Sequence, residues 1–360
     1  MQYLWQFYLL IGLVFVQGTL LLFNSKATKN LFLWLCYLEL IFIAGFRAWD
    51  IGNDTPNYIS TFSAVVNHLD LYLSHMEKGY LLYNKFLSLF ASDPQAILIS
   101  NAIIIVGGIG LFCRKYSTSI FLSILLFGIL QFSSTLNIMR QYLALAIVLS
   151  AVPFIVKRQF IAFGVCCAIA ATFHTSAALA IGLYFLYSLN FKFKHLVWIS
   201  VGVILSFIFL APILDHVISI TGRYAGYKGN ILLGEEMKTA SIVKTLVQLS
   251  ITVFCLFSYR FVYKKKPFLT EKLPIPFLLF CCITATALQF ISIRGTVLER
   301  LVLYFSIFNL ISIPFFICCY PKKVQILVAA SLLGCFIVYH SVIFVYRPEW
   351  NYVLPFVFCF

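Results

Sequence analysis

The chain has 360 residues, of which 62% are hydrophobic and only 11% are charged, and its mean hydropathy is +0.97. Soluble proteins carry about a quarter charged residues, so this composition excludes an ordinary soluble domain. The formal net charge of +14 is spread over short loops. Because nucleic-acid binding needs a concentrated basic patch, we expect no nucleic-acid partner.

Long apolar runs recur along the whole chain and are continuous rather than alternating. About 20 apolar residues cross a hydrocarbon core of roughly 30 Å as a helix, and helices satisfy their own backbone groups there. We therefore predict an all-α integral membrane protein, one polytopic domain over residues 1–360 with about 12 transmembrane helices. The predicted segments are residues 3–23, 31–46, 96–112, 120–136, 141–156, 160–173, 176–190, 196–213, 241–259, 274–293, 301–320 and 324–345. The first has neither a basic leader nor a small-residue cleavage site, so we expect a retained helix.

Charge asymmetry orients these segments. Six alternate loops contain 15 basic residues and one acid, whereas the other side contains 11 basic residues and ten acids. The positive-inside rule places the first set in the cytoplasm. Both termini and two larger loops, 47–95 and 214–240, are then external. The inner loops leave no room for a nucleotide-binding domain and no GxxxxGK[ST] is present, which excludes an ATP-driven pump.

The eleven cysteines lie mostly within apolar segments and lack metal-ligand spacing. We read them as small hydrophobic residues, and we expect no metal, no cofactor and no disulfide framework.

Glu39 is an acid near the middle of the second segment, where a carboxylate is costly. It either makes an interhelical hydrogen bond or lines a pocket for a lipid substrate.

The richest polar stretch runs from Arg47 to Tyr58, at the external end of the second segment. Gly52 permits a tight turn, and Thr55-Pro56 suits the start of a helix, with Asp54 or Thr55 as the N-cap. Arg47 is expected to reach water from the interface. The carboxylate of Asp54 is then either a helix cap or a group that takes part in a reaction.

Three more polar clusters follow on the same predicted face. Glu77-Lys78-Gly79-Tyr80 precedes an amphipathic stretch, 81–90, that could lie in the outer interface. Asn137, Arg140 and Gln141 share one helical face. Arg140 has no acid beside it in the sequence, so it is an interfacial anchor or wants an anionic partner, for which we hypothesise a ligand phosphate.

Two further polar interruptions lie between predicted apolar segments on this face. One contains His174 and the other runs from Arg294 to Tyr304. A histidine at a helix end is often structural, and Glu299 can simply neutralise a neighbour. Four arginines nevertheless collect on one face with few acids to pair them. This favours a site for a polyanion, such as a membrane-borne diphosphate. The four are Arg47, Arg140, Arg294 and Arg300.

In order along the chain, these motifs resemble the EpsG/Wzy-type family of polysaccharide polymerases, which includes bacterial O-antigen polymerases. The resemblance spans about residues 47 to 305. It rests on R-x4-G-x-D-T-x2-Y-x3-F (Arg47, Gly52, Asp54, Thr55, Tyr58, Phe62), E-x-G-Y (Glu77, Gly79, Tyr80), N-x2-R-Q-x-L-A (Asn137, Arg140, Gln141, Leu143, Ala144), F-H-x-S (Phe173, His174, Ser176) and R-x3-Y-F (Arg300, Tyr304, Phe305).

The resemblance implies a multi-pass protein of the bacterial inner membrane that joins oligosaccharide repeat units carried on undecaprenyl diphosphate, at the periplasmic face. Its partners would be that lipid-linked oligosaccharide, the bilayer and, as a candidate, a chain-length regulator protein.

This reaction assigns roles to the clustered residues. An acceptor hydroxyl needs a general base, for which Asp54 and His174 compete and Glu77 is third. The leaving diphosphate needs fixed positive charge. We expect this from Arg47, Arg140 and Arg300, with Arg294 a weaker candidate. Asn137, Gln141, Tyr58 and Tyr304 complete the predicted substrate contacts.

Two other functions share this topology. A flippase or polysaccharide transporter should show polar groups along the full transmembrane path, whereas the sequence shows them mainly at one end. A ligase or acyltransferase of the same envelope pathway would leave polymer length normal.

Overall fold

The computed structural model describes residues 4–23, 25–68, 76–209, 239–263, 272–295, 298–346 and 352–360. Within these ranges the chain is helical and the only extended pairing is one bridge, so the predicted all-α class is confirmed. Most of the second predicted external loop, 214–240, lies outside the described residues.

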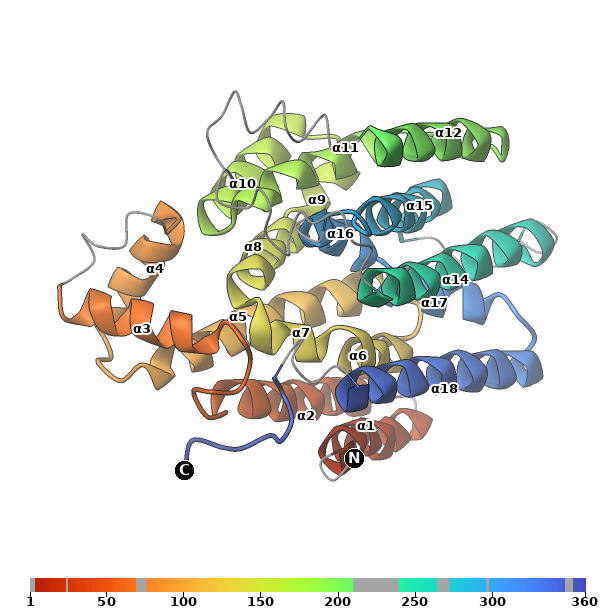
Figure 1. Cartoon of the computed structure of the whole chain (residues 1–360). Helices are drawn as coiled ribbons and strands as arrows, with labels where there is room; N and C mark the ends of the chain where they lie inside the picture. Colours follow the sequence, from red (N-terminus) through yellow and green to blue (C-terminus); the bar gives the residue numbers. More distant parts are fainter. Residues whose placement is uncertain are drawn as a thin grey trace.

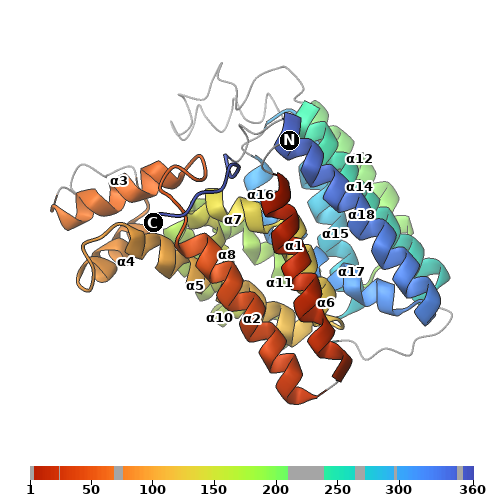
Figure 2. The same ribbon diagram turned by 90° about the horizontal axis from the view of Figure 1, so that it is seen from below.

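The amino-terminal half packs around α5, which is buried along much of its length. Figure 2 shows α1 and α2 running side by side, while α3 and α4 extend to one side of the bundle. Of the first two helices, α2 packs on α5 and α1 on α6. The elements are α1 (Leu4–Gly18), η1 (Thr19–Phe23), α2 (Lys26–Gly45), α3 (Thr55–Val66), α4 (Lys78–Ser88) and α5 (Gln95–Tyr116). Glu39 of α2 accepts a hydrogen bond from Gln17 Nε2 of α1 at 2.6 Å, which confirms the interhelical interpretation.

The middle of the chain is a series of short helices, some of which are divided at polar or proline residues. Gln131 separates α6 from α7, and Pro153 stands in the first turn of α9. These helices are α6 (Ile120–Leu130), α7 (Phe132–Asn137), α8 (Met139–Ser150), α9 (Val152–Val156), α10 (Phe160–Phe173), η3 (Thr175–Ile181), α11 (Gly182–Leu186) and α12 (Lys194–Ile208). Figure 1 places α7 and α8 in the interior, between α3–α4 on one side and α14–α18 on the other.

The carboxy-terminal part contains longer helices and a bend. α16 and α17 meet at 41°, and Pro314 lies inside α17. The helices are α14 (Thr239–Phe261), α15 (Ile275–Ile291), α16 (Glu299–Ser306), α17 (Asn309–Cys318) and α18 (Lys322–Tyr346).

Six of the described helices are long and apolar enough to cross a membrane, or up to seven if the bent pair α16–α17 is one span. Five further apolar helices have 10–17 residues. These helices are consistent with a multi-pass membrane protein. The predicted number of about twelve spans remains a prediction, because breaks such as Gln131 divide several predicted segments.

A line of buried polar side chains follows α14 between α15 and α17. Its hydrogen bonds include Asn309 Nδ2 to Gln248 Oε1 at 2.9 Å, Thr252 Oγ1 with Thr286 Oγ1 at 2.8 Å, and Ser258 Oγ with Tyr320 Oη at 3.0 Å. We call this line, Ser241, Thr245, Gln248, Thr252 and Ser258 with their partners, the polar seam. Polar groups are therefore not confined to one end of the bundle, contrary to expectation.

Candidate functional site

Arg47 lies at the end of α2 but does not reach water. Only 1% of its surface is exposed. Its guanidinium donates to the carbonyls of Ala44, Ile51 (3.3 Å) and Leu136 (3.1 Å), and Nη2 lies 3.0 Å from Met139 Sδ. Burial lowers the pKa of Arg47 to about 9, which leaves it charged at neutral pH. Arg47 therefore joins the ends of α2 and α7 to the loop between α2 and α3.

Gly52 and Thr55 make this junction tight. Gly52 has φ +96°, in the left-handed region that glycine tolerates. A Cβ there would lie 2.6 Å from the Leu136 carbonyl oxygen. Thr55 is fully buried and its Oγ1 donates to the carbonyl of Ile51 at 2.6 Å. The first sequence motif is thus a packed turn against the end of α7.

Asp54 precedes α3, with proline in the first turn of the helix as expected, but its carboxylate makes no capping hydrogen bond. Its backbone N–H donates to Asn137 Oδ1 at 3.0 Å. Burial raises the pKa of Asp54, against the opposing fields of Arg300 and Arg140 and a hydrogen bond with Tyr58. The carboxylate therefore bonds to Tyr58 within the field of the two arginines and does not cap the helix.

Arg140 lies at the start of α8 and forms an ion pair with Glu77 at the start of α4. Arg140 therefore has an anionic partner, as expected, but among the described residues this partner is a carboxylate distant in the sequence. Binding of a ligand phosphate stays a prediction. The guanidinium lies 5.9 Å from the ring centre of Tyr58 and 5.7 Å from that of Tyr80, within the range of cation–π attraction. Its buried Nε has no hydrogen-bond partner among the described residues. About a quarter of the side chain is exposed, so the arginine is held but remains accessible.

The close approach of α4 to α10 explains the glycine of the Glu77 motif. A Cβ on Gly79 would lie 2.0 Å from Thr172 Oγ1 and 2.9 Å from the Thr172 carbonyl oxygen. Thr175 Oγ1, just beyond α10, lies 3.5 Å from Glu77 Oε1. Glycine at position 79 thus lets α4 bring Glu77 to Arg140.

His174 lies between α10 and η3, in extended conformation. Its Nδ1 is 2.7 Å from Ser176 Oγ, which is 3.2 Å from Tyr304 Oη of α16. Burial, and then the field of Arg300, lowers the pKa of His174 to about 4. The imidazole is therefore neutral at neutral pH, with Nδ1 engaged by Ser176.

Arg300, in the first turn of α16, has an exposed side chain with no hydrogen bond or ion pair among the described residues. Its backbone carbonyl accepts from Gln141 Nε2, and Gln141 Oε1 is buried without a partner in the described chain. The fields of Arg300 and Arg140 both act on Asp54 and His174. Arg300 therefore contributes a positive charge to the cluster that no hydrogen bond or ion pair of the described residues engages.

Arg294 lies apart. Its Nη1 donates to the Phe207 carbonyl at 3.2 Å, and its guanidinium lies over the Phe207 ring at 4.9 Å. Glu299 accepts from Lys244 Nζ and Ser241 Oγ, both at 2.7 Å. The carboxylate of Glu299 thus neutralises a lysine at one end of the polar seam.

Nine of the predicted residues form one connected group, which we call the outer cluster. They are Asp54, Tyr58, Glu77, Asn137, Arg140, Gln141, His174, Arg300 and Tyr304. Arg47 lies beneath this cluster and Arg294 outside it. Sequence analysis left Tyr80 and Ser176 out of the candidate list, although both stand in the motifs beside chosen residues.

Among the described residues, no three His, Cys, Asp or Glu side chains gather as a metal-binding group. The outer cluster offers arginines for an anion and two titratable groups for proton transfer.

Comparison with known proteins gives one family and no individual relative. No match was found among curated proteins or among solved structures. The EpsG family model matches residues 30–358, a range that contains the whole outer cluster, and the chain belongs to the EpsG family.

Proposed function

We propose that this protein is a polysaccharide polymerase that joins oligosaccharide repeat units carried on undecaprenyl diphosphate. Membership of the EpsG family supports polymerisation of polysaccharide in general. The observation that carries the finer proposal is that two arginines act on Asp54 and His174. Arg140 is held by Glu77, whereas the Arg300 side chain has no hydrogen bond or ion pair among the described residues.

In the proposed reaction a hydroxyl of the acceptor unit attacks the anomeric carbon of the donor sugar. The bond from that carbon to the diphosphate oxygen breaks, and the lipid diphosphate leaves with the electron pair. Arg140 and Arg300 stabilise the developing negative charge. Arginine suits this role because its fork can bind two phosphate oxygens at once.

The proton of the acceptor hydroxyl passes to Asp54 or His174. Asp54 has a carboxylate free of any capping bond, and His174 is neutral and can accept a proton. Ser176 and Tyr304 fix the imidazole through Nδ1. Glu77 is engaged by Arg140, so we give it the role of orienting that arginine.

Arg47 receives a positioning role in this proposal. Its guanidinium is enclosed by carbonyl groups, which leaves it without a face for a diphosphate. It instead fixes the loop that carries Asp54. Arg294 is given no role in the reaction.

The proposed location is the bacterial inner membrane, with the outer cluster facing the periplasm and the chain ends on that side. Helices α5 and α8–α9 run from the neighbourhood of the cluster to the basic pairs Arg114–Lys115 and Lys157–Arg158. This supports the orientation given by the positive-inside rule. No observation favours the flippase alternative, because the polar seam is buried between packed helices.

Purified protein supplied with a defined lipid-diphosphate-linked repeat unit should make a ladder of products. Single units with wild-type protein, or an unchanged ladder with the Arg140→Ala variant, would reject the proposal. In cells, loss of the protein should leave single units on the external face. Units trapped inside would indicate a flippase, and normal-length polymer retained on its carrier would indicate a ligase.

A further inference from the structure

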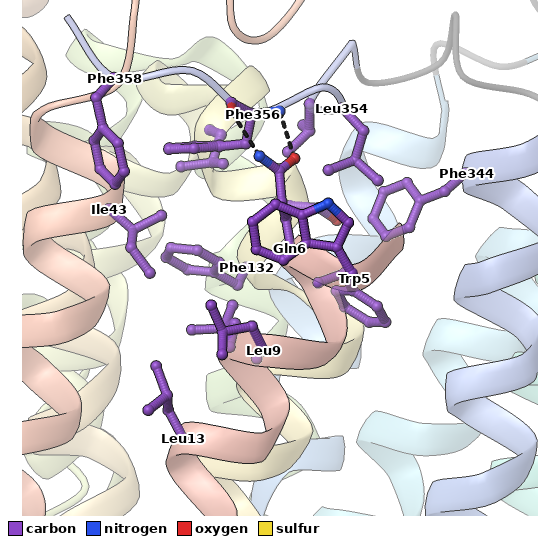
Figure 3. A pocket seen from close by; sticks show the side chains of 16 residues that line it. Trp5, Gln6, Leu9, Leu13, Ile43, Phe132, Phe344, Leu354, Phe356 and Phe358 are labelled. Atoms are coloured by element: carbon purple, nitrogen blue, oxygen red, sulfur yellow. Dashed lines mark hydrogen bonds between the residues drawn. The ribbon is translucent and has the colours of Figure 1, made fainter. Parts of the chain in front are cut away.

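An apolar pocket lies beside α7. It has a volume of about 170 Å³ and is formed by α1, α2, α6, α7, α18 and the segment 352–360. Figure 3 shows the side chains of Trp5, Leu9, Phe132 and Phe344 around it, with Phe356 and Phe358 at one end. Its walls are aromatic and aliphatic except at Gln6 and Ser133.

Two neighbours of the pocket show that it is a real space within the protein. Gly128 is buried, yet a Cβ placed on it would meet nothing within 4 Å. Ser133 is only 5% exposed, and its Oγ has no hydrogen-bond partner among the described residues. A buried glycine facing open space beside an unpartnered hydroxyl is typical of a wall shaped for an occupant.

Residues 352–360, which we call the C-terminal strap, close the pocket at one end. Gln6 exchanges two hydrogen bonds with the backbone of Phe356, both 2.8 Å long, drawn as dashed lines in Figure 3. The strap continues to the loop of the first motif. There Gly52 N–H donates to the Tyr352 carbonyl at 2.9 Å, and Arg47 and Phe358 form an antiparallel bridge.

The pocket and the outer cluster share α7. Ser133 and Leu136 line the pocket, whereas the carbonyl of Leu136 holds Arg47 and the next residue, Asn137, holds Asp54. A molecule in the pocket would thus lie against the same short helix whose last residue contacts the proposed reaction centre.

Resting on the proposed function, we infer that this pocket binds a section of the prenyl chain of a lipid-linked substrate. A cavity of about 150 Å³ admits a benzene-sized hydrocarbon, so this one holds one short section of a longer chain. Rigid aromatic walls complement the methyl branches and planar double bonds of a prenyl chain. A saturated phospholipid chain lacks these branches and double bonds, so it makes fewer close contacts with such walls.

Photolabelling of the full-length protein in nanodiscs tests the site directly. The probe is a diazirine-bearing prenyl monophosphate, and a diazirine-bearing phosphatidylethanolamine serves for comparison. We expect the prenyl probe to label peptides from α1 and α7, and unlabelled prenyl phosphate to displace it. Pocket labelling by the phospholipid probe that prenyl phosphate does not displace would identify bulk lipid and overturn the inference.

The variant Gly128→Leu should fill the pocket without a backbone clash. We expect its labelling by the prenyl probe to be lost, and its apparent affinity for the lipid-linked substrate to fall, because the leucine side chain would occupy the space that the prenyl section fills. Gly12→Leu is the matched control. Its Cβ also meets nothing within 4 Å, but Gly12 is exposed on α1 and is not a lining residue. Equal labelling of both variants and wild type would overturn the inference.

The probe has neither sugar nor diphosphate, so its binding does not depend on glycosyl transfer. Labelling lost in Gly128→Leu alongside an unchanged product ladder in Arg140→Ala would keep the prenyl site and reject the polymerase. Labelling absent from α1 and α7 alongside a lost ladder in Arg140→Ala would reject the prenyl site and keep the polymerase.

Discussion

The outer cluster and the polar seam are both rich in polar side chains, but they differ in how far those side chains are satisfied by hydrogen bonds and ion pairs. In the seam, hydroxyl and amide groups mostly bond to one another between packed helices, as Asn309 does to Gln248. In the outer cluster, the Arg300 side chain has no hydrogen bond or ion pair among the described residues, and the buried Nε of Arg140 has no hydrogen-bond partner there. Polar groups that satisfy each other stabilise a membrane bundle, whereas unsatisfied charge at an accessible place indicates a ligand.

The largest expected effect is that of Arg140→Ala. Removing a charge that stabilises the leaving group should lower the rate of polymerisation about 10²–10³-fold. The rate is measured from product ladders made by purified protein. Arg140→Lys keeps the charge but loses the planar fork, and should retain part of the activity. Full activity in the alanine variant would show that Arg140 has a structural role, like the polar side chains of the seam, and none in the reaction.

Asp54→Asn and His174→Gln separate the two candidate bases. The variant that removes the base should lose about 10²–10⁴-fold in rate, and the other should lose much less. If Asp54 is the base, activity falls as the pH is lowered through its raised pKa, because the protonated carboxyl cannot accept a proton. That acid limb should disappear from the residual activity of Asp54→Asn. An unchanged acid limb in this variant would exclude Asp54.

His174 also gives a prediction for stability. Its pKa is about 4 in the folded protein against a usual 6.5, so the unfolded chain binds more protons between these values. Stability should therefore rise as the pH increases from about 4 to about 6.5, and level off above. Thermal unfolding of wild type and His174→Gln in detergent measures this. The same slope in both would assign it to other groups.

A smaller effect is expected for Gly79→Ala. The added Cβ meets Thr172, including its backbone oxygen, so α4 must move and Glu77 no longer orients Arg140. A displacement of this kind should slow polymerisation about tenfold or more. Gly107→Ala in α5 is the matched control, because its Cβ meets nothing within 4 Å. Similar rates in both would show that the α4–α10 contact does not set the geometry of the site.

The smallest effect on activity is expected within the seam. Asn309→Leu leaves Gln248 Oε1 without its donor and should cost about 0.6–1.7 kcal/mol of stability. The rate per folded molecule should stay at the wild-type value. Comparing the amount of folded protein after heating with its product ladder separates the two quantities. A large loss of rate at unchanged stability would give the seam a part in the reaction.

The membrane class and most members of the outer cluster could be predicted from sequence, because hydropathy and motif spacing are local properties. The ion pair of Arg140 and Glu77 could not, since 63 residues separate them and only the packing of α4 against α10 brings them together. Arg47 shows the opposite difficulty. A cation at a helix end suggests an exposed anchor, but one of the carbonyls that enclose Arg47, that of Leu136, comes from α7, 89 residues later.

The C-terminal strap has a consequence for biosynthesis. The hydrogen bonds between Gln6 and Phe356 join residues 350 positions apart, and the loop of Asp54 is pinned by residues 352–359. Membrane helices can enter the bilayer one after another as they are made, but this loop cannot acquire its final shape until residues 352–359 have left the ribosome. A nascent chain that has not yet reached residue 352 therefore lacks the contacts that fix the loop of Asp54.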